Sequence, residues 1–341
     1  MRMAPHPCST VDGYRSAGWH TGHMGQHQAT DETGHHFHHS ALLYAGEDGF
    51  LEGTLPFLKG AVAAEEPVLV AVSNARIELL RSALGDDAEL VHFADMHVLG
   101  SNPARIIPAW RRFLADHAPD ERPVRGIGEP IWAGRNDAEL TECQRHETLL
   151  NVAFDSGQAW RLLCPYDLDA LDDEVIEAAR CSHPFVAQDG ANRVSDAYSH
   201  KHEASSPFDG ALSAPTTQPQ ELAFTSHELA DLRWFVSRRA AHASLGTMRT
   251  QDLVLAVNEL ATNSIRHGGG EGMLRMWTET DTLLCEVHDR GQITEPLVGR
   301  TYPAPTRSTG RGLWVVNHLC DLVQIRSTPT GSVVRVHMRL T

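Results

Sequence analysis

The chain has 341 residues, enough for two domains, and its 41% apolar and 21% charged residues are typical of a globular protein. No apolar run approaches the roughly 18 residues of a membrane span, and no basic flank precedes an apolar run at the N-terminus, so we expect a cytoplasmic protein without membrane contact. The net charge is −15, but the residues from Glu221 onward carry 13 Arg against 12 Asp and Glu. Neither part has a dense basic patch, which argues against nucleic-acid binding.

Residues 1–39 are polar and rich in glycine and histidine, without a regular apolar period. We expect this leader to be disordered. Clustered imidazoles also bind zinc or nickel, so a metal site is the alternative, although no carboxylate or cysteine lies at the spacing of a structural site. The clustered histidines are His20, His23, His27, His35, His36, His38 and His39.

Residues 40–186 alternate between short apolar runs and segments with helical periodicity. The apolar runs predict buried strands at Ala41–Ala45, Val68–Ser73, Leu90–Ala94, Gly126–Ile131 and Arg161–Pro165. The periodic segments predict helices at Gly49–Ala64, Asn74–Leu84, Asn102–His117, Glu139–Ser156 and Asp172–Cys181. Such alternation predicts an α/β domain with a mainly parallel sheet and helices on both of its faces.

Residues 187–220 are rich in Ala, Ser, Pro and Asp and lack periodicity, which predicts a linker. The pattern then changes class over residues 221–341. Helices are expected from Phe224 to Ala243 and from Gln251 to His267, where three glycines end the second helix. Strands are expected at Met273–Thr278, Leu283–Asp289, Leu322–Ser327 and Ser332–Leu340. The turn between the last two strands predicts an antiparallel hairpin, and hence a helix-on-sheet α+β sandwich.

The second helix of this domain carries a polar stripe. Glu259, Asn263 and His267 follow one another at i, i+4 and i+8, so they share one side of the helix. A carboxylate one turn from a carboxamide oxygen suits Mg²⁺, which prefers oxygen ligands. The carboxylate can instead act as a base on a hydroxyl. Taken alone, such a stripe is also what a solvated helix edge looks like.

Two glycine-containing segments follow. Asp289 ends a strand, and Gly291 turns the chain behind it, so the carboxylate is placed to accept a hydrogen bond from an exocyclic amine such as that of adenine. In isolation this is also an ordinary polar turn. Further on, Gly310 and Gly312 precede an apolar helix, and bare N–H groups at a helix N-terminus bind anions such as phosphate. A single G-x-G is weak evidence, because glycines also punctuate loops.

In this order, the segments NELATNSIRHG, DRGQI and STGRGLWVVNHLCD resemble the N, G1 and G2 boxes of the ATPases that include gyrase, Hsp90, histidine kinases and MutL. The short domain most resembles the anti-sigma factor serine kinases typified by SpoIIAB and RsbW, over about 115 residues. This resemblance implies an α+β sandwich of the GHKL, or Bergerat, type that binds ATP and Mg²⁺. It makes Glu259 the general base and Asn263 the Mg²⁺ ligand. The remaining ATP-binding residues that it implies are His267, Asp289, Gly291, Thr309, Gly310, Arg311 and Gly312.

The second box departs from the family pattern. The family has Asp-x-Gly-x-Gly, whereas Ile293 stands here at the last glycine position. A β-branched residue adopts positive φ only at a high cost. We therefore expect the loop from Gly291 to Thr309 to close differently over a nucleotide and binding to be weakened.

The N-terminal α/β segment resembles the MEDS sensory domain through ALLY at residues 41–44, GEPIW at 128–132 and the helix ECQRHE at 142–147. The resemblance implies that this domain senses a small molecule. Glu129, Trp132, Cys143 and Glu147 are candidates for lining its pocket, although residues such as Trp132 and Cys143 are more often simply core residues. No Walker loop is present, which argues against nucleotide hydrolysis in this half.

Three functions fit these observations. The first is a serine/threonine kinase that phosphorylates an anti-anti-sigma partner of the STAS type, with regulation of a sigma factor and, by resemblance, a homodimer. The second is a sensor histidine kinase with His227 as acceptor, but residues 187–220 lack the pattern of a two-helix dimerisation hairpin. The third is an ATP-dependent partner-binding switch without turnover. The presence of Glu259 argues against it, and Ile293 argues mildly for it.

Overall fold

The computed structural model describes residues 37–119, 122–154, 159–198, 208–302 and 311–340. By their contacts they divide into two compact units. The first contains residues up to 94, then 117–135 and 154–204, and the second contains residues 95–116, 136–153 and 205–341. The expected disordered, histidine-rich leader lies outside the described residues up to position 36, but the expectation was wrong for residues 37–39, which begin a strand because they pair with residues 160–162. Within the described ranges, none of the helices combines the length and the hydrophobicity of a membrane span.

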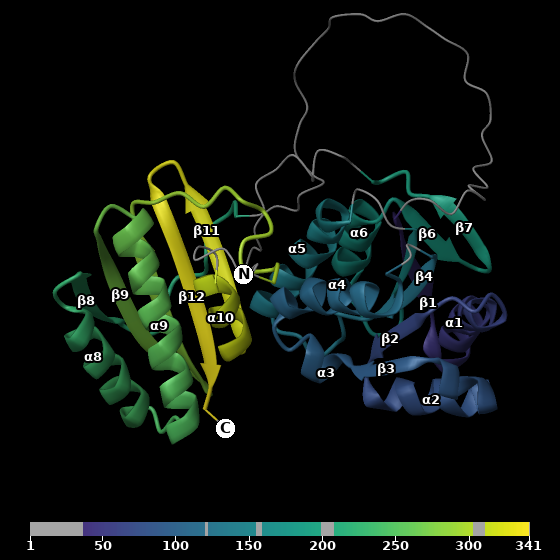
Figure 1. Cartoon of the computed structure of the whole chain (residues 1–341), viewed down its shortest axis with the longest axis horizontal. Coiled ribbons are helices and arrows are strands. Elements are labelled where there is room, and N and C mark those ends of the chain that lie inside the picture. The colour runs from purple at the N-terminus through teal and green to yellow at the C-terminus, as the bar shows by residue number, and fades with distance from the viewer. Residues whose placement is uncertain (1–36, 120–121, 155–158, 199–207, 303–310, 341) are drawn as a thin grey trace, which may run out of the picture. The chain divides into compact units, whose positions relative to one another are not determined.

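The first unit is built on a seven-stranded sheet with the order β3-β2-β4-β5-β1-β6-β7 (Figure 1). Strand β1 is parallel to β5 and β6, and β4 is parallel to β2 and β5. Only β7, among the pairs whose direction is determined, runs antiparallel. The strands are β1 (Phe37–Tyr44), β2 (Val68–Val72), β3 (His92–Asp95), β4 (Val124–Gly128), β5 (Trp160–Asp167), β6 (Phe185–Gln188) and β7 (Ala191–Val194). The predicted mainly parallel α/β fold is confirmed.

Helices α1 (Gly46–Ala63) and α2 (Asn74–Leu84) pack on this sheet, and α6 (Asp173–Ser182) connects β5 to β6. The core is formed by fully buried strand residues such as Val70 and Ile127 together with Phe50 and Leu58 of α1. Continuous apolar runs in the central strands are expected when both faces of a parallel sheet are covered.

Three further helices precede the linker: α3 (Met96–Leu99), α4 (Ile106–His117) and α5 (Asp137–Ala153), with a short 3-10 helix at Pro103–Arg105. Apart from the last residue of α4, they group with the second unit. Arg105 donates hydrogen bonds to the carbonyl oxygens of Asn317, His318 and Cys320, at 2.9 Å each. These carbonyls lie at the C-terminal end of α10 (Arg311–Leu319), where helical carbonyls lack intrahelical partners.

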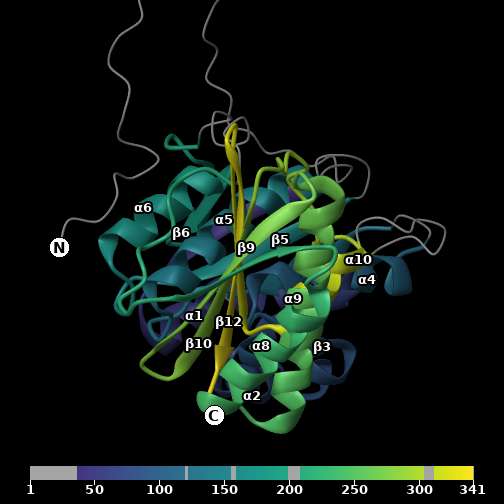
Figure 2. The same ribbon diagram turned by 90° about the vertical axis from the view of Figure 1, so that its left-hand side faces the viewer.

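The second unit contains a five-stranded sheet with the order β11-β12-β10-β9-β8, and its strands show the usual twist (Figure 2). The four neighbouring strand pairs of this sheet are antiparallel. The strands are β8 (Gln220–Thr225), β9 (Glu271–Glu279), β10 (Thr282–Asp289), β11 (Leu322–Thr328) and β12 (Gly331–Arg339). The predicted hairpin between the last two strands is confirmed by the pairing of Thr328 with Gly331.

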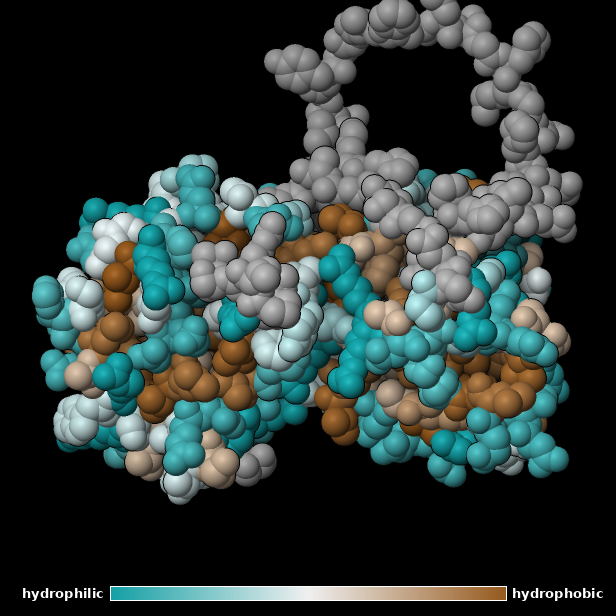
Figure 3. Space-filling model, in the orientation of Figure 1, coloured by the Kyte–Doolittle hydropathy of each residue, from teal (hydrophilic) through white to brown (hydrophobic). Residues whose placement is uncertain are grey.

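Helices α8 (Leu229–His242), α9 (Thr247–His267) and α10 cover one face of this sheet (Figure 1). Helix α9 lies against the sheet with Leu253, Val257 and Leu260 buried. Figure 3 shows apolar side chains on the surface of this unit. Trp234 of α8 and Met248 of α9 are exposed large apolar residues. The predicted α+β sandwich is confirmed.

Two local expectations were wrong. Phe224 and Thr225 belong to strand β8 rather than to a helix, and α8 begins at Leu229. The pairing of β8 with β9 overrides the local helix-start signal. The expected linker also contains the hairpin of β6 and β7 within residues 185–194. Its turn is Asp189-Gly190, and both residues have positive φ, as a tight hairpin of this kind requires.

Candidate functional site

The predicted polar stripe lies on one edge of α9. The apolar residues of the helix are buried against the sheet, so Glu259 and Asn263 are left half-buried at the rim of the core. Among the described residues, neither side chain has a hydrogen-bond partner. His267, the last residue of α9, is exposed. Glu259 and Asn263 therefore present a carboxylate and a carboxamide that are available to a ligand.

The start of α10 lies directly against these two side chains. A Cβ atom added at Gly312 would be 3.0 Å from Oε2 of Glu259 and 3.0 Å from Nδ2 of Asn263. The absence of a side chain at this position therefore allows the first turn of α10 to approach α9. The N–H groups of a helical first turn attract anions, so the approach brings a phosphate-binding element beside the two predicted Mg²⁺ and base residues.

Asp289, at the end of β10, is held in one orientation. Its Oδ1 accepts hydrogen bonds from Gly291 N and Ser332 Oγ, both at 2.8 Å. Its Oδ2 accepts one from Ser264 Oγ at 2.6 Å. A carboxylate has about four acceptor positions, so Oδ2 retains one for a further donor. This is the arrangement that recognition of an exocyclic amine requires.

Close backbone packing surrounds Asp289. A Cβ atom at Gly291 would lie 2.7 Å from the carbonyl oxygen of His267. A Cβ atom at Gly268 would lie 2.4 Å from Cγ of Asp289. Gly291 was predicted to shape the nucleotide pocket, and the structure gives a steric reason for glycine here, because a side chain would collide with the end of α9. His267 takes part here through its backbone carbonyl, and its side chain is exposed.

The departure at Ile293 is accommodated without strain. Ile293 is not among the residues with positive φ, its N–H donates to Ser327 Oγ at 2.8 Å, and its side chain packs on the core of the unit. The backbone at Ile293 therefore lies beside Ser327 of β11 and has a conformation that a β-branched residue adopts without strain. Of the predicted phosphate-binding residues, Thr309 and Gly310 lie outside the described residues, and Arg311 is the exposed first residue of α10.

The residues that are described fit Mg-ATP. Gly312 provides a bare helix terminus, Glu259 and Asn263 provide unpaired oxygen atoms, and Asp289 provides one remaining acceptor position. Ser264 and Ser332, which fix Asp289, were not among the predicted residues. Ser264 lies on the buried side of α9 with Leu260 and Val257, where its hydroxyl gave no separate signal, and Ser332 is distant in sequence, so its part depends on the β10–β12 pairing.

In the first unit, Glu129 directly follows β4 and is buried. It accepts a hydrogen bond from Arg76 Nη1, while Arg76 Nη2 donates to Asp167 Oδ2 at 3.2 Å. Burial raises the pKa of Glu129 to about 7, although the Arg76 guanidinium opposes this rise. Burial likewise raises the pKa of the Tyr44 hydroxyl, and the nearby Glu129 adds to the rise.

This cluster of Glu129, Arg76, Asp167 and Tyr44 lies at the carboxyl ends of parallel strands, the edge where α/β sheets bind ligands. Only Glu129 was predicted. Two of the three missed residues carry the same sequence signal, since Tyr44 and Asp167 each end a strand, whereas Arg76 lies within α2 and carries none.

The other predicted pocket residues do not extend the Glu129 cluster. Trp132 is half-buried, with the Arg135 guanidinium 3.7 Å from its ring centre. Cys143 and Glu147 are buried on α5, which groups with the second unit. A shared pocket of Glu129, Trp132, Cys143 and Glu147 therefore stays a prediction.

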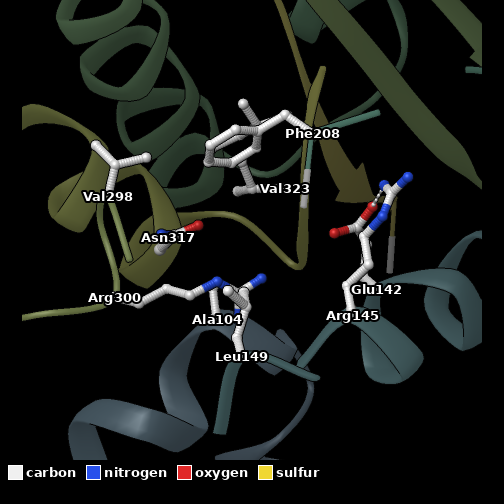
Figure 4. Close-up of a pocket in the computed structure, with 10 residues that line it drawn as sticks. Ala104, Glu142, Arg145, Leu149, Phe208, Val298, Arg300, Asn317 and Val323 are labelled. Carbon is white, nitrogen blue, oxygen red and sulfur yellow. Dashed lines mark hydrogen bonds and ion pairs between the residues drawn. The ribbon is translucent and has the colours of Figure 1, made fainter. Parts of the chain in front are cut away.

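The second unit also has a pocket that is separate from the predicted nucleotide site. Figure 4 shows Arg145 and Glu142 of α5 with Arg300, Asn317 and Val323 around it. Burial lowers the pKa of the Arg300 guanidinium. None of the described residues predicted to bind ATP lines this pocket.

Comparisons with known proteins agree with these two architectures. The family model of the MEDS (methanogen/methylotroph, DcmR sensory) domain matches residues 38–184, and that of the histidine kinase-like ATPase domain matches residues 222–338. No curated protein matches the chain.

Several solved structures are weakly similar. The RsbU and RsbW domains of a Mycobacterium tuberculosis protein are 16% identical over 35% of this chain and 32% of that one, with a TM-score of 0.27. The Acinetobacter baumannii histidine kinase AdeS is 12% identical over 37% and 70% of the two chains, with a TM-score of 0.23. The catalytic domain of the histidine kinase ThkA is 16% identical over 36% and 97%, with a TM-score of 0.24. The chain thus spans about a third of the first of these structures.

The strand order of each sheet, the three sequence boxes and the two family matches agree with one another. The chain therefore contains a MEDS sensory domain followed by a histidine kinase-like ATPase domain.

Proposed function

We propose that the protein is a signal-responsive serine/threonine kinase of the anti-sigma factor type, which uses Mg-ATP to phosphorylate an anti-anti-sigma protein of the STAS class. One observation carries the proposal. The start of α10 at Gly312 lies against both Glu259 and Asn263, two side chains with no partner among the described residues. Phosphoryl transfer depends mainly on positioning and electrostatics, which this arrangement supplies.

Each residue has a defined role in this proposal. Asn263 offers an oxygen ligand to Mg²⁺, and Asp289 accepts the adenine amine at the free position of Oδ2. The N–H groups of the first turn of α10 hold phosphate oxygens. Glu259 accepts the proton of the partner's serine or threonine hydroxyl as that oxygen bonds to phosphorus. Bound Mg-ATP supplies its terminal phosphoryl group, the bond from this phosphorus to the bridging oxygen breaks, and ADP leaves.

The sensory domain regulates this site in the proposal. A small molecule binds at the carboxyl edge of the parallel sheet, where Glu129 and Arg76 form their ion pair. Arg105, which belongs to the MEDS match, caps the C-terminal end of α10 through three carbonyl oxygens. A shift of this arginine would alter the helix whose first turn faces the nucleotide. The proposal also includes regulation of a sigma factor, a homodimer and a cytoplasmic location.

The histidine kinase alternative has less support. His227 lies in the turn between β8 and α8, and the described residues between 187 and 220 contain no helix that would form a dimerisation hairpin. A switch that binds ATP and a partner without turnover remains the second candidate. It differs from the kinase in one respect, because it does not need the carboxylate of Glu259.

The decisive experiment replaces Glu259 with Gln and incubates the full chain with radiolabelled Mg-ATP and purified STAS-type partner proteins. We expect wild type to label a serine or threonine of one partner, and Glu259→Gln to reduce the rate by about 100-fold or more while nucleotide affinity stays the same. Glu271→Gln, at an exposed carboxylate of β9, is the matched control and should retain the wild-type rate. Unchanged labelling by Glu259→Gln would exclude the proposed base, and label on histidine would favour the histidine kinase.

A further inference from the structure

Three metal-ligating side chains of the first unit come together in its interior. His39 lies in β1, Cys164 lies in β5, and His183 directly follows α6. Their exposed fractions are 1%, 1% and 0%. One ligand atom from each lies within 4.8 Å of the others. None of these residues belongs to the nucleotide site or to the Glu129 cluster.

The parallel pairing of β1 with β5 explains why His39 and Cys164 lie close together. In the β1–β5 pair, His39 is opposite Leu162 and Ala41 is opposite Cys164. Residues two apart in a strand point to the same face, so His39 and Cys164 share a face on neighbouring strands. Helix α6 ends on that same face, because the ring of His183 lies 4.1 Å from the ring of His39 and 5.6 Å from that of Tyr166.

The geometry suits a metal ion. His39 Nε2 and Cys164 Sγ are 3.4 Å apart. Bond lengths of about 2.0 Å to nitrogen and 2.3 Å to sulfur place two ligands of a tetrahedral zinc ion roughly 3.5 Å apart. Cys164 is not part of a disulfide, so its sulfur can bind a metal as a thiolate. The two atoms thus have the spacing that a shared zinc ion requires, without a rearrangement of the sheet.

The third ligand is oriented by a hydrogen bond. His183 Nδ1 lies 2.8 Å from the carbonyl oxygen of Ala179. A carbonyl oxygen only accepts, so Nδ1 is the donor in this hydrogen bond, and Nε2 is the ring nitrogen left to bind a metal. A backbone carbonyl that fixes the outer nitrogen of a histidine is the usual support of a metal ligand.

We propose that His39, Cys164 and His183 bind one Zn²⁺ ion inside the MEDS domain. Two imidazoles and one thiolate are a ligand set that zinc accepts, with a further ligand completing four-coordination. The ion links β1, β5 and the end of α6, three elements far apart in the sequence. Because binding requires a thiolate and neutral imidazoles, it releases protons, and zinc affinity rises with pH.

The test uses the full chain, freed of metal with a chelator and titrated with Co²⁺ as a spectroscopic substitute for Zn²⁺. We expect the wild type to reach saturation at about one Co²⁺ per chain with a thiolate-to-cobalt charge-transfer band. Cys164→Ser should lose this band. Cys8→Ser, which removes the cysteine of the histidine-rich leader, should keep it and thereby separates the buried site from binding by the leader.

A second measurement addresses variants that are less stable. We expect Zn²⁺ to raise the melting temperature of the wild type relative to the chelated protein, and this rise to be absent in both Cys164→Ser and His183→Gln, whatever their own melting temperatures. A charge-transfer band that survives in Cys164→Ser, or a wild type that binds no Co²⁺ through thiolate, would overturn the proposed site.

Discussion

The hydroxyl of Ser264 on α9 donates a hydrogen bond of 2.6 Å to Oδ2 of Asp289 at the end of β10. The bond joins the helix that carries Glu259 and Asn263 to the strand that carries the predicted adenine-binding carboxylate. Ser332 and the N–H of Gly291 hold the other oxygen. The carboxylate is therefore held as an acceptor before any ligand binds, and preorganisation of this kind lowers the entropic cost of binding.

The first prediction concerns this carboxylate. Asp289→Asn replaces one acceptor oxygen with an N–H₂ donor, which would face the amine of adenine. We expect ATP affinity to fall by about 100-fold, the loss typical of a hydrogen bond to a charged group, with a smaller change for GTP. Competition between each nucleotide and a fluorescent ATP analogue measures both affinities. Equal losses for ATP and GTP would contradict base recognition by Asp289.

The second prediction concerns the contact between α9 and α10. Gly312→Ala places a methyl group 3.0 Å from Glu259 Oε2 and Asn263 Nδ2, so these side chains must move. We expect Mg-ATP affinity to fall about tenfold while the melting temperature changes little, because alanine is favourable in a helix. Gly246→Ala, where an added Cβ meets no atom within 4 Å, is the control. If Gly312→Ala bound Mg-ATP like the wild type, the first turn of α10 would not border the nucleotide.

The third prediction is a pH dependence of the second unit. Burial and the neighbouring Arg335 guanidinium lower the pKa of His337 from 6.5 to about 4. The unfolded chain therefore binds this proton first, so the stability that neutral His337 contributes is present above pH 6.5 and is lost as the pH falls to about 4. The loss amounts to about 3 kcal/mol.

Denaturant unfolding of the wild type and of His337→Gln, at several pH values, measures this effect. Glutamine does not titrate, so the difference in unfolding free energy between the two proteins should change between pH 6.5 and about pH 4 and be constant above that range. Parallel stability curves for the two proteins would show that His337 has no depressed pKa.

Much of the fold could be predicted because its strands and helices have strong periodicity. The expected helix Asn74–Leu84 coincides with α2, and the expected strand Leu283–Asp289 differs from β10 by one residue. The errors arose where long-range pairing decides the structure. Strand β8 has only partial burial and depends on β9 as its partner. The Asp189-Gly190 turn was a local signal for the β6–β7 hairpin, but its polar surroundings resemble a linker.

In the candidate sites, too, residues with a local sequence pattern could be predicted, and residues brought together by long-range pairing could not. Glu259 and Asn263 were found because their helical spacing is visible in the sequence. Ser332 and Arg76 are separated from the residues they support by 43 and 53 positions, and only the completed sheets bring them together. His39 and Cys164 are 125 residues apart, so the proposed zinc site likewise depends on the parallel pairing of β1 with β5.

Calorimetric titration of the full chain with Mg-ATP, beside Asn263→Ala, tests the central claim most directly. Asn258→Ala is the matched control, since Asn258 lies on the same helix but pairs with Arg233. We expect the wild type and Asn258→Ala to bind one ATP per chain, and Asn263→Ala to bind about 100-fold more weakly. Absence of binding by the wild type at millimolar Mg-ATP, or equal binding by Asn263→Ala, would contradict the nucleotide site at α9 and α10.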